Sequence, residues 1–460
     1  MADQVLVAVL LVLLSKLKSS LSAKPKLNLP PGPWTLPVIG SIHHLIANPL
    51  IYRTLRGLAQ KHGPLMTIRL GEAPVLVVSS PEAAREVLKT HDTTFADRFT
   101  NATAAAISYN ATDVALSPYG ERWRQLRKIC VLELLSAVRV QSFRRIREEE
   151  VARFMRSVAA SAAAGDEMDM SAAIFWFIYD AFMRECVGSR CKYQGSRIMQ
   201  MLATAPRKAL ACRDRMQRVL ERVMKEKKEA MDSGAETVHE SFVGFNLAND
   251  VYTMNNVMAT RRCRIITVSA NGQGFSRTGS AGRQWPRCRP RCEKPSKGRP
   301  QSSRMTFYLK LVIKETLRMH SHLPFLIPRR CRKTSRVMGY DIPEGTTVLI
   351  NVWAICRDPQ VLGRSRGVQP ERFESNNMDY KGTNYEYLPF GSGRRMCPGA
   401  TLGLANISLA LLSLLYHFDW KLCDGVEPKD VDVREAVGII ANKRTNLVLR
   451  PVTRIAPANA

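Results

Sequence analysis

The stretch Pro389-Phe390-Gly391-Ser392-Gly393-Arg394-Arg395-Met396-Cys397-Pro398-Gly399-Ala400 surrounds one cysteine with the residues that a buried, metal-bound thiolate requires. Its glycines allow tight turns and let main-chain N–H groups approach the sulfur, which glycine permits at low cost. Arg394 and Arg395 add positive charge, which favours the ionised thiol and can pair with an anionic ligand. Pro398 suits the first turn of a helix, and the apolar run that follows to about Tyr416 predicts a buried helix. The stretch therefore predicts a ligand cysteine at the start of a core helix.

The spacing within this stretch resembles the haem-binding signature of the cytochrome P-450 family, the haem-thiolate monooxygenases. The matching positions are Phe390, Gly391, Gly393, Arg395, Cys397 and Gly399. The resemblance implies that Cys397 is the iron ligand of a haem (heme) group, that Phe390 packs beside it, and that Gly393, Arg395 and Gly399 belong to the cofactor-binding loop. It also implies a mainly α-helical fold with small β-sheets. Considered alone, a single cysteine is most often an ordinary core residue.

Length and composition fit one large globular enzyme. The chain has 460 residues, 45% of them apolar, which is enough for a sizeable core, although two or three domains would also fit this length. The net charge is +28, and the segment from Asn255 to Arg304 holds twelve Lys or Arg and one acidic residue. A charge of this size suggests a nucleic-acid or anionic-membrane partner. Eleven cysteines without a regular framework indicate free thiols in a reducing compartment.

The N-terminus carries a short apolar run, Val5 to Leu14, followed by Lys16 and Lys18. The run is shorter than the roughly 20 residues that span a bilayer, so a signal-peptide core and a soluble linker remain alternatives. The following Pro30-Pro31-Gly32-Pro33 resembles the proline-rich hinge of microsomal family members. Residues 1–29 are therefore predicted to be a membrane anchor and linker in the endoplasmic reticulum. Residues 30–460 are predicted to form a cytosolic haem-thiolate domain.

Local patterns predict the elements that precede the cysteine loop. Apolar periodicity and capping residues indicate helices at Ile51–His62, Pro81–Lys89 (capped by Ser80), Phe143–Met155 and Met170–Cys186, and strands at Leu65–Leu70 and Val75–Ser79. Small residues at 161–165 are predicted to link the last two helices. Residues 99–118 have no clear period and are predicted to be a loop suited to substrate contact.

Trp123 and Arg127 fall one turn apart on a predicted helix. There, an indole N–H and a guanidinium can reach a common anion. The pair resembles the family's propionate-binding helix, and the same resemblance places Arg329 near a haem propionate. An exposed amphipathic pair is the alternative interpretation.

Glu315 and Arg318 lie three residues apart on a predicted helix at Lys310–Met319, and Arg372 follows in the stretch Pro370-Glu371-Arg372-Phe373. An isolated pair at this spacing is usually a surface contact worth roughly a few tenths of a kcal/mol. These positions, however, resemble the family's Glu-x-x-Arg helix and its later arginine partner. The resemblance implies a buried charged cluster of Glu315, Arg318 and Arg372 that fixes the cysteine loop.

Two apolar segments are predicted to contact the substrate. Phe325, Leu326 and Ile327 are expected to point over the haem from an extended strand at 324–329, and Val437, Gly438 and Ile439 match the family's last substrate-contact loop. These side chains suggest a hydrophobic substrate of terpenoid, fatty or aromatic type. Core packing explains them about as well.

The central region departs from the family pattern. Residues 252–304 lack a helical period and are rich in breakers and basic side chains, which predicts disorder. The resemblance implies instead a central oxygen-binding helix in which an acidic residue and a threonine relay protons. The sequence contains no such patch, so this helix is predicted to be missing or disrupted and no catalytic pair is assigned. The chain is either a divergent member or, as we favour, a mis-spliced or frame-shifted product of a family gene.

The resemblance implies a monooxygenase that inserts one oxygen atom of O₂ into a hydrophobic small molecule, such as a terpenoid or another specialised metabolite. Electrons are expected from a separate NADPH-cytochrome P-450 reductase, because the chain has no dinucleotide fingerprint. The first alternative is a catalytically impaired haem-binding remnant. The second is a basic nucleic-acid-binding or zinc protein, suggested by Cys288 and Cys292 among arginines. This second alternative lacks the paired Cys or His residues that a tetrahedral zinc site requires. Nucleic acid is therefore not an expected partner.

Overall fold

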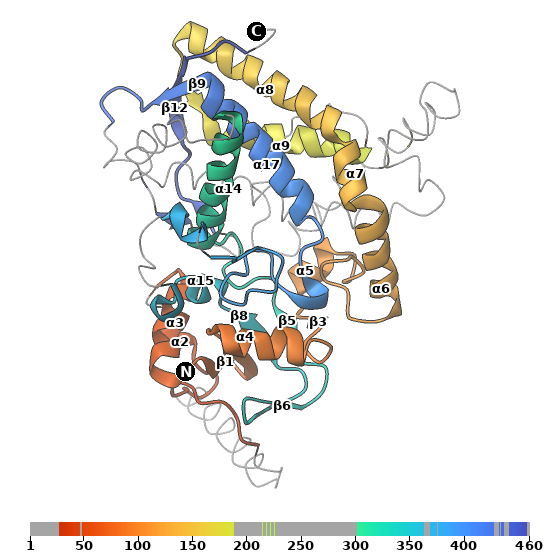
Figure 1. Cartoon of the computed structure of the whole chain (residues 1–460). Helices are drawn as coiled ribbons and strands as arrows, with labels where there is room; N and C mark the ends of the chain where they lie inside the picture. Colours follow the sequence, from red (N-terminus) through yellow and green to blue (C-terminus); the bar gives the residue numbers. More distant parts are fainter. Residues whose placement is uncertain are drawn as a thin grey trace, which may run out of the picture.

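The computed structural model describes residues 27–46, 48–187, 301–362, 369–374, 376–426, 434–436 and 441–457, with isolated positions 214, 218, 221, 225 and 432. Helices dominate this part of the chain and the strands form small sheets, as the sequence predicts. The long helices α8, α9, α14 and α17 gather at one end of the molecule, and the largest sheet lies at the other with the N-terminal helices (Figure 1).

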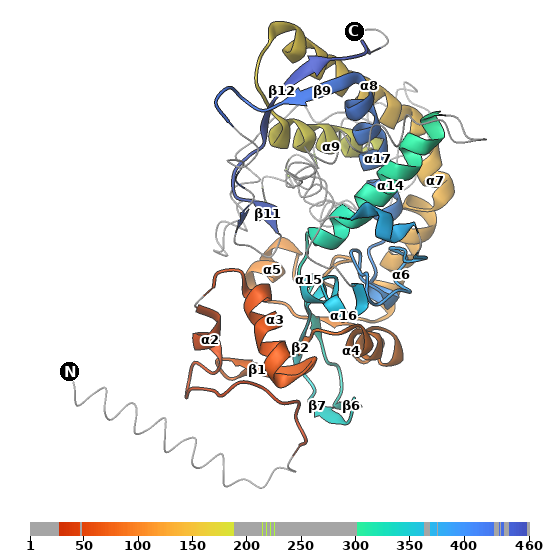
Figure 2. The same cartoon turned by 60° about the vertical axis from the view of Figure 1, so that its left-hand side comes forward.

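The largest sheet joins segments that are far apart in the sequence. Its strand order is β1-β2-β8-β5-β3, with β2 and β8 parallel and the other pairs antiparallel. The strands are β1 (Leu65–Leu70), β2 (Ala73–Val78), β3 (Asp97–Arg98), β5 (Arg329–Arg330) and β8 (Thr347–Ile350). The helices α2 (Ile42–Ile46) and α3 (Ile51–His62) lie beside this sheet (Figure 2). The proline-rich segment packs along β1, where the Thr67 N–H donates to the Pro31 carbonyl at 2.9 Å.

Two local caps determine how the chain leaves this sheet. Ser80 accepts a hydrogen bond from the Ala83 N–H at 3.2 Å and begins α4 (Pro81–Arg85), which a π-helical turn, η1 (Glu86–Thr90), continues. The predicted loop at 99–118 instead contains a short helix, α5 (Ala102–Ile107). Its side-chain cap, Asn101, accepts from the Ala104 N–H at 2.7 Å, a signal that apolar periodicity does not reveal.

Among the described residues, the helical part has six main helices: α6 (Glu121–Lys128), α7 (Ala137–Ser142), α8 (Arg144–Ala164), α9 (Met170–Val187), α14 (Gln301–Met319) and α17 (Ala400–His417). The small residues predicted as a linker continue α8, which ends at Gly165 with a φ of +71°. α14 begins at Gln301, whereas the sequence predicted a helix from Lys310. The prediction started late because the first turn of the helix is polar and shows no apolar period. The end of the segment predicted to be disordered, residues 301–304, is therefore helical, and residues 252–300 lie outside the described residues.

Short elements complete the fold. One sheet contains β4 (Met168–Asp169), β9 (Phe418–Lys421) and β12 (Val448–Thr453). Two further sheets are strand pairs, β6 (Ser335–Val337) with β7 (Tyr340–Ile342) and β10 (Glu435–Ala436) with β11 (Asn442–Lys443). The short helical turns are η2 (Ile129–Leu134), α15 (Val352–Ile355), α16 (Pro359–Leu362), η3 (Pro370–Phe373) and η4 (Gly393–Arg395). The strand predicted at 324–329 forms only at its last residue, because Leu326 adopts a φ of +56° and the chain turns.

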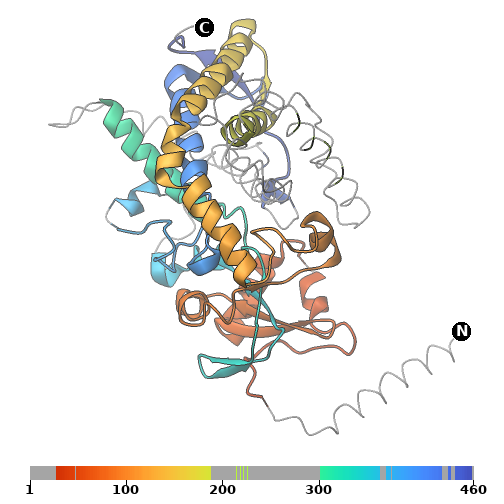
Figure 3. The same cartoon turned by 90° about the vertical axis from the view of Figure 1, so that its right-hand side faces the viewer.

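α17, which follows the cysteine loop, is the centre of the helical part. It runs between α8 and α14 (Figures 1 and 3), and Leu402, Leu404 and Ile407 on it are buried. By length and composition it is the one helix among the described residues that could cross a membrane. Its packing against α8 and α14 accounts for that apolar composition.

Candidate active site

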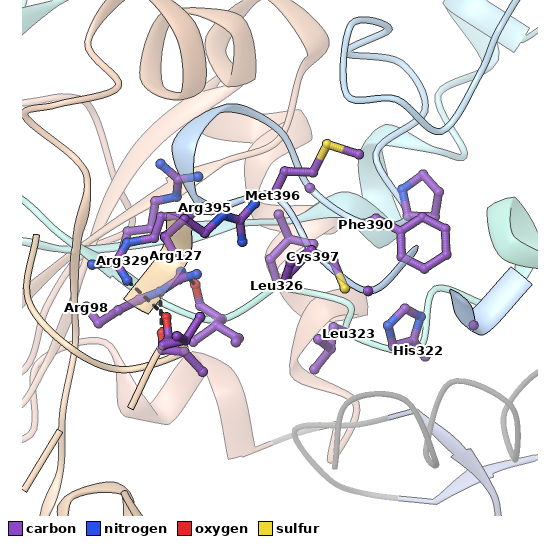
Figure 4. A pocket seen from close by; sticks show the side chains of 18 of the residues that line it. Arg98, Arg127, His322, Leu323, Leu326, Arg329, Phe390, Arg395, Met396 and Cys397 are labelled. Atoms are coloured by element: carbon purple, nitrogen blue, oxygen red, sulfur yellow. Dashed lines mark hydrogen bonds between the residues drawn. The ribbon is translucent and has the colours of Figure 1, made fainter. Parts of the chain in front are cut away.

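A cavity lies where the cysteine loop, α6 and the segment before β5 meet. Counted together with its open mouth, the empty space here is about 990 Å³. Cys397 and Phe390 lie on one side and a group of arginines on the other (Figure 4). The predicted residues that line it are Trp123, Arg127, Leu326, Ile327, Arg329, Phe390, Arg395, Cys397 and Gly399. The structure thus brings most of the predicted site together.

The cysteine loop is held by its own backbone. The Cys397 N–H donates to the Phe390 carbonyl at 3.0 Å, and Gly391 and Gly393 adopt φ values of +74° and +68°. Such left-handed conformations favour glycine because they crowd a Cβ. The Cys397 thiol is free and partly exposed, and its sulfur faces the cavity (Figure 4). The loop therefore presents one thiol as a ligand.

Gly393 packs the cysteine loop against Leu88 and Asp92, and it does not line the cavity. A Cβ at this position would lie 2.5 Å from the Leu88 carbonyl oxygen and 2.8 Å from Asp92 Oδ1. Asp92 itself accepts from the Arg394 N–H at 3.2 Å and pairs with Arg329 Nη1 at 3.3 Å. Gly393 thus lets the loop pack directly on the turn after α4.

Gly393→Ala is expected to lower the free energy of unfolding by more than about 2 kcal/mol, because it combines left-handed strain with a steric clash against backbone. Denaturant unfolding of the purified protein, followed by tryptophan fluorescence, measures this loss. Gly57→Ala in α3 is the matched control, since a Cβ there meets only open space. Equal stability of the two variants would contradict the assigned packing role.

Arginines form the side of the cavity that lies away from Cys397. Arg395 donates through Nε to the Ala96 carbonyl at 2.7 Å and through Nη2 to the Ser117 carbonyl at 2.6 Å. Burial, followed by the nearby Arg329, lowers the pKa of Arg395 to about 9. Burial also lowers the pKa of Arg329 and of Arg127. Several guanidinium groups withdrawn from water in one place indicate a site for an anionic group.

Arg98 belongs to this group and was not predicted. It lines the cavity, and its Nη1 donates to the Ile327 carbonyl at 2.6 Å. The sequence signal was weak, because Arg98 stands at the start of an unpatterned loop. Only the pairing of β3 with β5 brings it beside Arg329.

Trp123 differs from its predicted role. Its indole N–H donates to the Val114 carbonyl at 3.0 Å and is not directed at an anion. The ring instead supports Arg395, whose guanidinium carbon lies 4.3 Å from the ring centroid. Of the predicted pair, Arg127 carries the charge and Trp123 positions a second arginine.

Glu315, Arg318 and Arg372 form the predicted buried cluster. Arg318 donates from Nε to Glu315 Oε2 at 2.7 Å and from Nη2 to Glu315 Oε1 at 2.8 Å, and Arg372 Nε lies 3.2 Å from Glu315 Oε2. Arg318 also donates to the Cys356 carbonyl at 2.8 Å. The cluster ties α14 to η3 and to α15.

The predicted substrate contacts separate into three groups. Leu326 and Ile327 line the cavity. Phe325 does not, because the turn at Leu326 directs it to a cluster with Tyr52, with ring centroids 6.3 Å apart. Val437, Gly438 and Ile439 lie outside the described residues. The prediction for Phe325 was therefore wrong.

His322 is a polar residue of the cavity wall that the sequence interpretation missed. Its side chain is 4% exposed and its ring lies 6.2 Å from that of Phe390, centroid to centroid. Burial lowers its pKa to about 4, so the imidazole is neutral at pH 7. A histidine three residues after a long helix carries no local signal for such a position.

A haem fits these residues. It needs a ligand for iron, cationic partners for two carboxylates and apolar walls for its ring, and the cavity supplies Cys397, the arginines and side chains such as Leu326 and Ile407. A cysteine ligand and buried arginines around an apolar cavity, in a mainly helical fold, define a haem-thiolate protein.

Comparisons with known proteins agree. The family model for cytochrome P-450 matches residues 30–205 and 300–449. The chain is 52% identical to zealexin A1 synthase and 51% identical to dolabradiene monooxygenase, both of Zea mays, with 100% of each chain covered. A solved zebra fish cytochrome P-450 structure with abiraterone superposes with a TM-score of 0.73 at 19% identity, covering 88% of this chain and 100% of that one. The chain belongs to the cytochrome P-450 family, and it is a haem-dependent monooxygenase that acts on hydrophobic substrates.

The same comparisons bear on the central segment. The family model leaves residues 206–299 unmatched, and the alignment with zealexin A1 synthase extends over 513 positions, more than the 460 residues of this chain. The residues that the family model leaves unmatched include most of the segment 252–304, where the sequence departs from the family pattern. The residues that suggested zinc, Cys288 and Cys292, lie in this unmatched segment and outside the described residues.

Proposed function

We propose that this monooxygenase inserts oxygen into a terpenoid hydrocarbon or another specialised metabolite. The juxtaposition of Cys397 with the arginine group in one apolar cavity carries the proposal. Dolabradiene monooxygenase and premnaspirodiene oxygenase of Hyoscyamus muticus, the latter 37% identical over 95% of each chain, support an olefinic substrate. The apolar walls at Val114, Leu326 and Ile327 suit a ligand without charge.

Haem, when bound, supplies the iron at which O₂ is reduced and activated. The chain's own residues hold and shield it. The Cys397 thiolate would ligate the iron, and Phe390 would pack beside the ligand loop in the same cavity wall. Arg98, Arg127 and Arg329 would bind the carboxylates, while the apolar walls would exclude water and orient the substrate. The acid and threonine that the resemblance implies are expected in the central region, which lies outside the described residues.

Turnover tests this function. Yeast microsomes containing the chain and a plant NADPH-dependent reductase would be incubated with sesquiterpene and diterpene olefins, and products would be identified by gas chromatography and mass spectrometry. A mono-oxygenated product that requires NADPH supports the proposal. A thiolate-type carbon-monoxide spectrum without product from any olefin would overturn it and favour the haem-binding remnant.

The central segment is proposed to be a misread part of the gene. The unmatched residues 206–299 support this, since the flanking parts match the family model. Translation of the coding DNA around residues 250–305 in all frames, with sequencing of the transcript, provides the test. Recovery of a helix with an acidic residue followed by threonine would support misreading, and a transcript that encodes only the present segment would refute it.

The reductase is proposed to dock on the basic face around α6 and α7. Lys128 is exposed there and Arg139 is half-buried on α7. Lys128→Glu with Arg139→Glu is expected to slow NADPH-dependent reduction at least fivefold without altering the carbon-monoxide spectrum. The matched control is Lys61→Glu, because Lys61 is exposed on α3, which lies on the other side of the molecule from α6 and α7 in Figure 1. Equal reduction rates in both variants would exclude the docking site.

Anchoring in the endoplasmic-reticulum membrane is proposed for residues 1–29. Three large side chains next to this segment, Trp34, Val38 and Ile46, are more than half exposed, which suits contact with a lipid surface. Flotation of the full chain and of a chain lacking residues 1–29 on microsomal-lipid vesicles measures the anchor. Equal flotation of both would refute its role.

A further inference from the structure

The cavity-wall segment, residues 322–327, has a backbone conformation that its own sequence does not favour. Leu326 and Ile327 line the cavity, and Leu326 has a φ of +56°, in the left-handed region that a leucine rarely adopts. Its side chain lies over the cysteine loop, since a Cβ on Gly391 would be 3.4 Å from Leu326 Cδ1. A strained residue persists only where surrounding contacts hold it. The contacts behind this segment therefore decide whether Leu326 stays in the cavity.

Tyr52, on α3, supports the cavity-wall segment from outside the cavity. Its buried ring packs against Phe325, with centroids 6.3 Å apart, and against Trp353, with centroids 5.1 Å apart. The Trp353 N–H in turn donates to the Pro324 carbonyl at 3.2 Å. Asn351 Nδ2 donates to the Tyr52 carbonyl at 3.0 Å, which fixes the backbone that carries the ring. Tyr52 thus reaches two consecutive residues of the segment, one directly and one through Trp353.

Glu435, on β10, fixes the other end of the Tyr52 side chain. The Tyr52 hydroxyl donates a hydrogen bond to Glu435 Oε2, and Arg53 Nη2 donates to the same oxygen at 3.0 Å. The Glu435 side chain is only 4% exposed, so water screens these bonds little. Hydrogen bonds to an ionised carboxylate are among the stronger ones in proteins. This carboxylate therefore holds the ring of Tyr52 against its neighbours.

Glu435 also reaches the cavity-wall segment by a second path, along the β10–β11 pair. It stands opposite Lys443 in this pair. Ala441 immediately precedes β11, and its N–H donates to the His322 carbonyl at 2.9 Å. The segment is thus held at His322 through the strand pair and at Phe325 through Tyr52. Both paths begin at the same buried carboxylate.

We propose that Glu435 and Tyr52 are positioning residues that hold the cavity-wall segment so that Leu326 stays in the cavity, and that they thereby influence which hydrophobic ligands fit there. The inference rests on the proposed function of this cavity and adds two residues that do not line it. A small displacement of a wall residue, caused far from the chemistry, changes how a ligand sits. Loss of this support should therefore alter ligand selectivity and leave haem ligation by Cys397 intact.

The test compares variants of the purified, haem-loaded full chain. Tyr52→Phe removes the hydroxyl and keeps the ring, Glu435→Ala removes the acceptor, and Glu435→Gln keeps an acceptor for the hydroxyl. The matched control is Tyr308→Phe, which removes another tyrosine–glutamate hydrogen bond, to Glu371 at 3.2 Å, away from the cavity lining. Hydrogen exchange of peptides covering residues 320–330, followed by mass spectrometry, reports on the segment. Soret titrations with imidazole and with clotrimazole, a small and a bulky ligand of haem iron, report on the cavity.

Tyr52→Phe and Glu435→Ala are expected to speed exchange within residues 320–330 by about fivefold, because local opening of the segment becomes easier. The ratio of the dissociation constants of imidazole and clotrimazole should change by about fivefold as well, while the carbon-monoxide spectrum keeps its thiolate form. Glu435→Gln should stay nearer the wild type, and Tyr308→Phe should change neither quantity. Adding Tyr52→Phe to Glu435→Ala should have little further effect, since both remove the same hydrogen bond.

Unchanged exchange, or an unchanged ratio of the two dissociation constants, in Tyr52→Phe and Glu435→Ala would overturn the proposal. An equal effect of Tyr308→Phe, or faster exchange over the whole chain, would also overturn it, because either result would show a general loss of stability. If Glu435→Ala does not fold, Tyr52→Phe and Glu435→Gln provide the same comparison. Neither measurement needs a substrate, so a failure here is distinguishable from absent turnover.

Discussion

Replacing Cys397 with alanine is expected to abolish the thiolate-type Soret band of the reduced carbon-monoxide complex and to reduce turnover to background. Cys397 is the one thiol that lines the cavity among the described residues. No other side chain on its side of the cavity is a thiolate, and haem without that ligand loses the electron donation that favours O–O cleavage. Difference spectroscopy and product analysis on equal amounts of protein measure both effects.

The control for this variant is Cys423→Ser, since Cys423 is also a free, partly exposed cysteine but lies away from the cavity near β12. It is expected to keep the spectrum and the turnover of the wild type. Cys397→His should bind haem with a nitrogen-type spectrum and remain inactive. A thiolate band that persists in Cys397→Ala would show that another cysteine ligates the iron.

The sequence predicted those parts of the site that are local in the chain. The cysteine loop and the pair Glu315 with Arg318 are specified by spacing over ten or fewer residues, and both form as predicted. The elements α3 and β1 have the predicted bounds because a regular apolar period and clear breakers define them. Such signals are read within one segment and do not depend on distant packing.

The missed features all depend on contacts between distant segments. Arg98 reaches the cavity only because β3 pairs with β5, and the Trp123 indole is directed by a carbonyl of the preceding loop. The side chains of Phe325 and Leu326 point to different places because the backbone turns at Leu326, which has a positive φ. No glycine at this position signals the turn in the sequence. The position of His322 depends on where α14 ends, three residues earlier. Sequence patterns identified the kinds of residue in the site better than the direction in which each side chain points.

Glu315→Gln is expected to prevent stable accumulation of the haem-loaded protein. Glu315 is fully buried and accepts from Arg318 and from the Gln369 N–H at 2.8 Å, so loss of its charge leaves Arg318 and Arg372 buried and unbalanced. Breaking a buried ion pair in this way costs about 3–5 kcal/mol, a large share of the roughly 5–15 kcal/mol that stabilises a typical protein.

Chemical unfolding and haem content, measured for Glu315→Gln and for Glu148→Gln, separate this cluster from an ordinary ion pair. Glu148 pairs with Arg144 at 2.7 Å one turn away on α8, but both side chains are exposed. Water and salt screen that pair, so its loss should leave stability and haem content unchanged. The cluster ties α14 to η3 and to the Cys356 carbonyl, so its loss should loosen the packing of α14 as well as lower stability. A Glu315→Gln protein as stable and as rich in haem as Glu148→Gln would show that the cysteine loop does not depend on this buried charge.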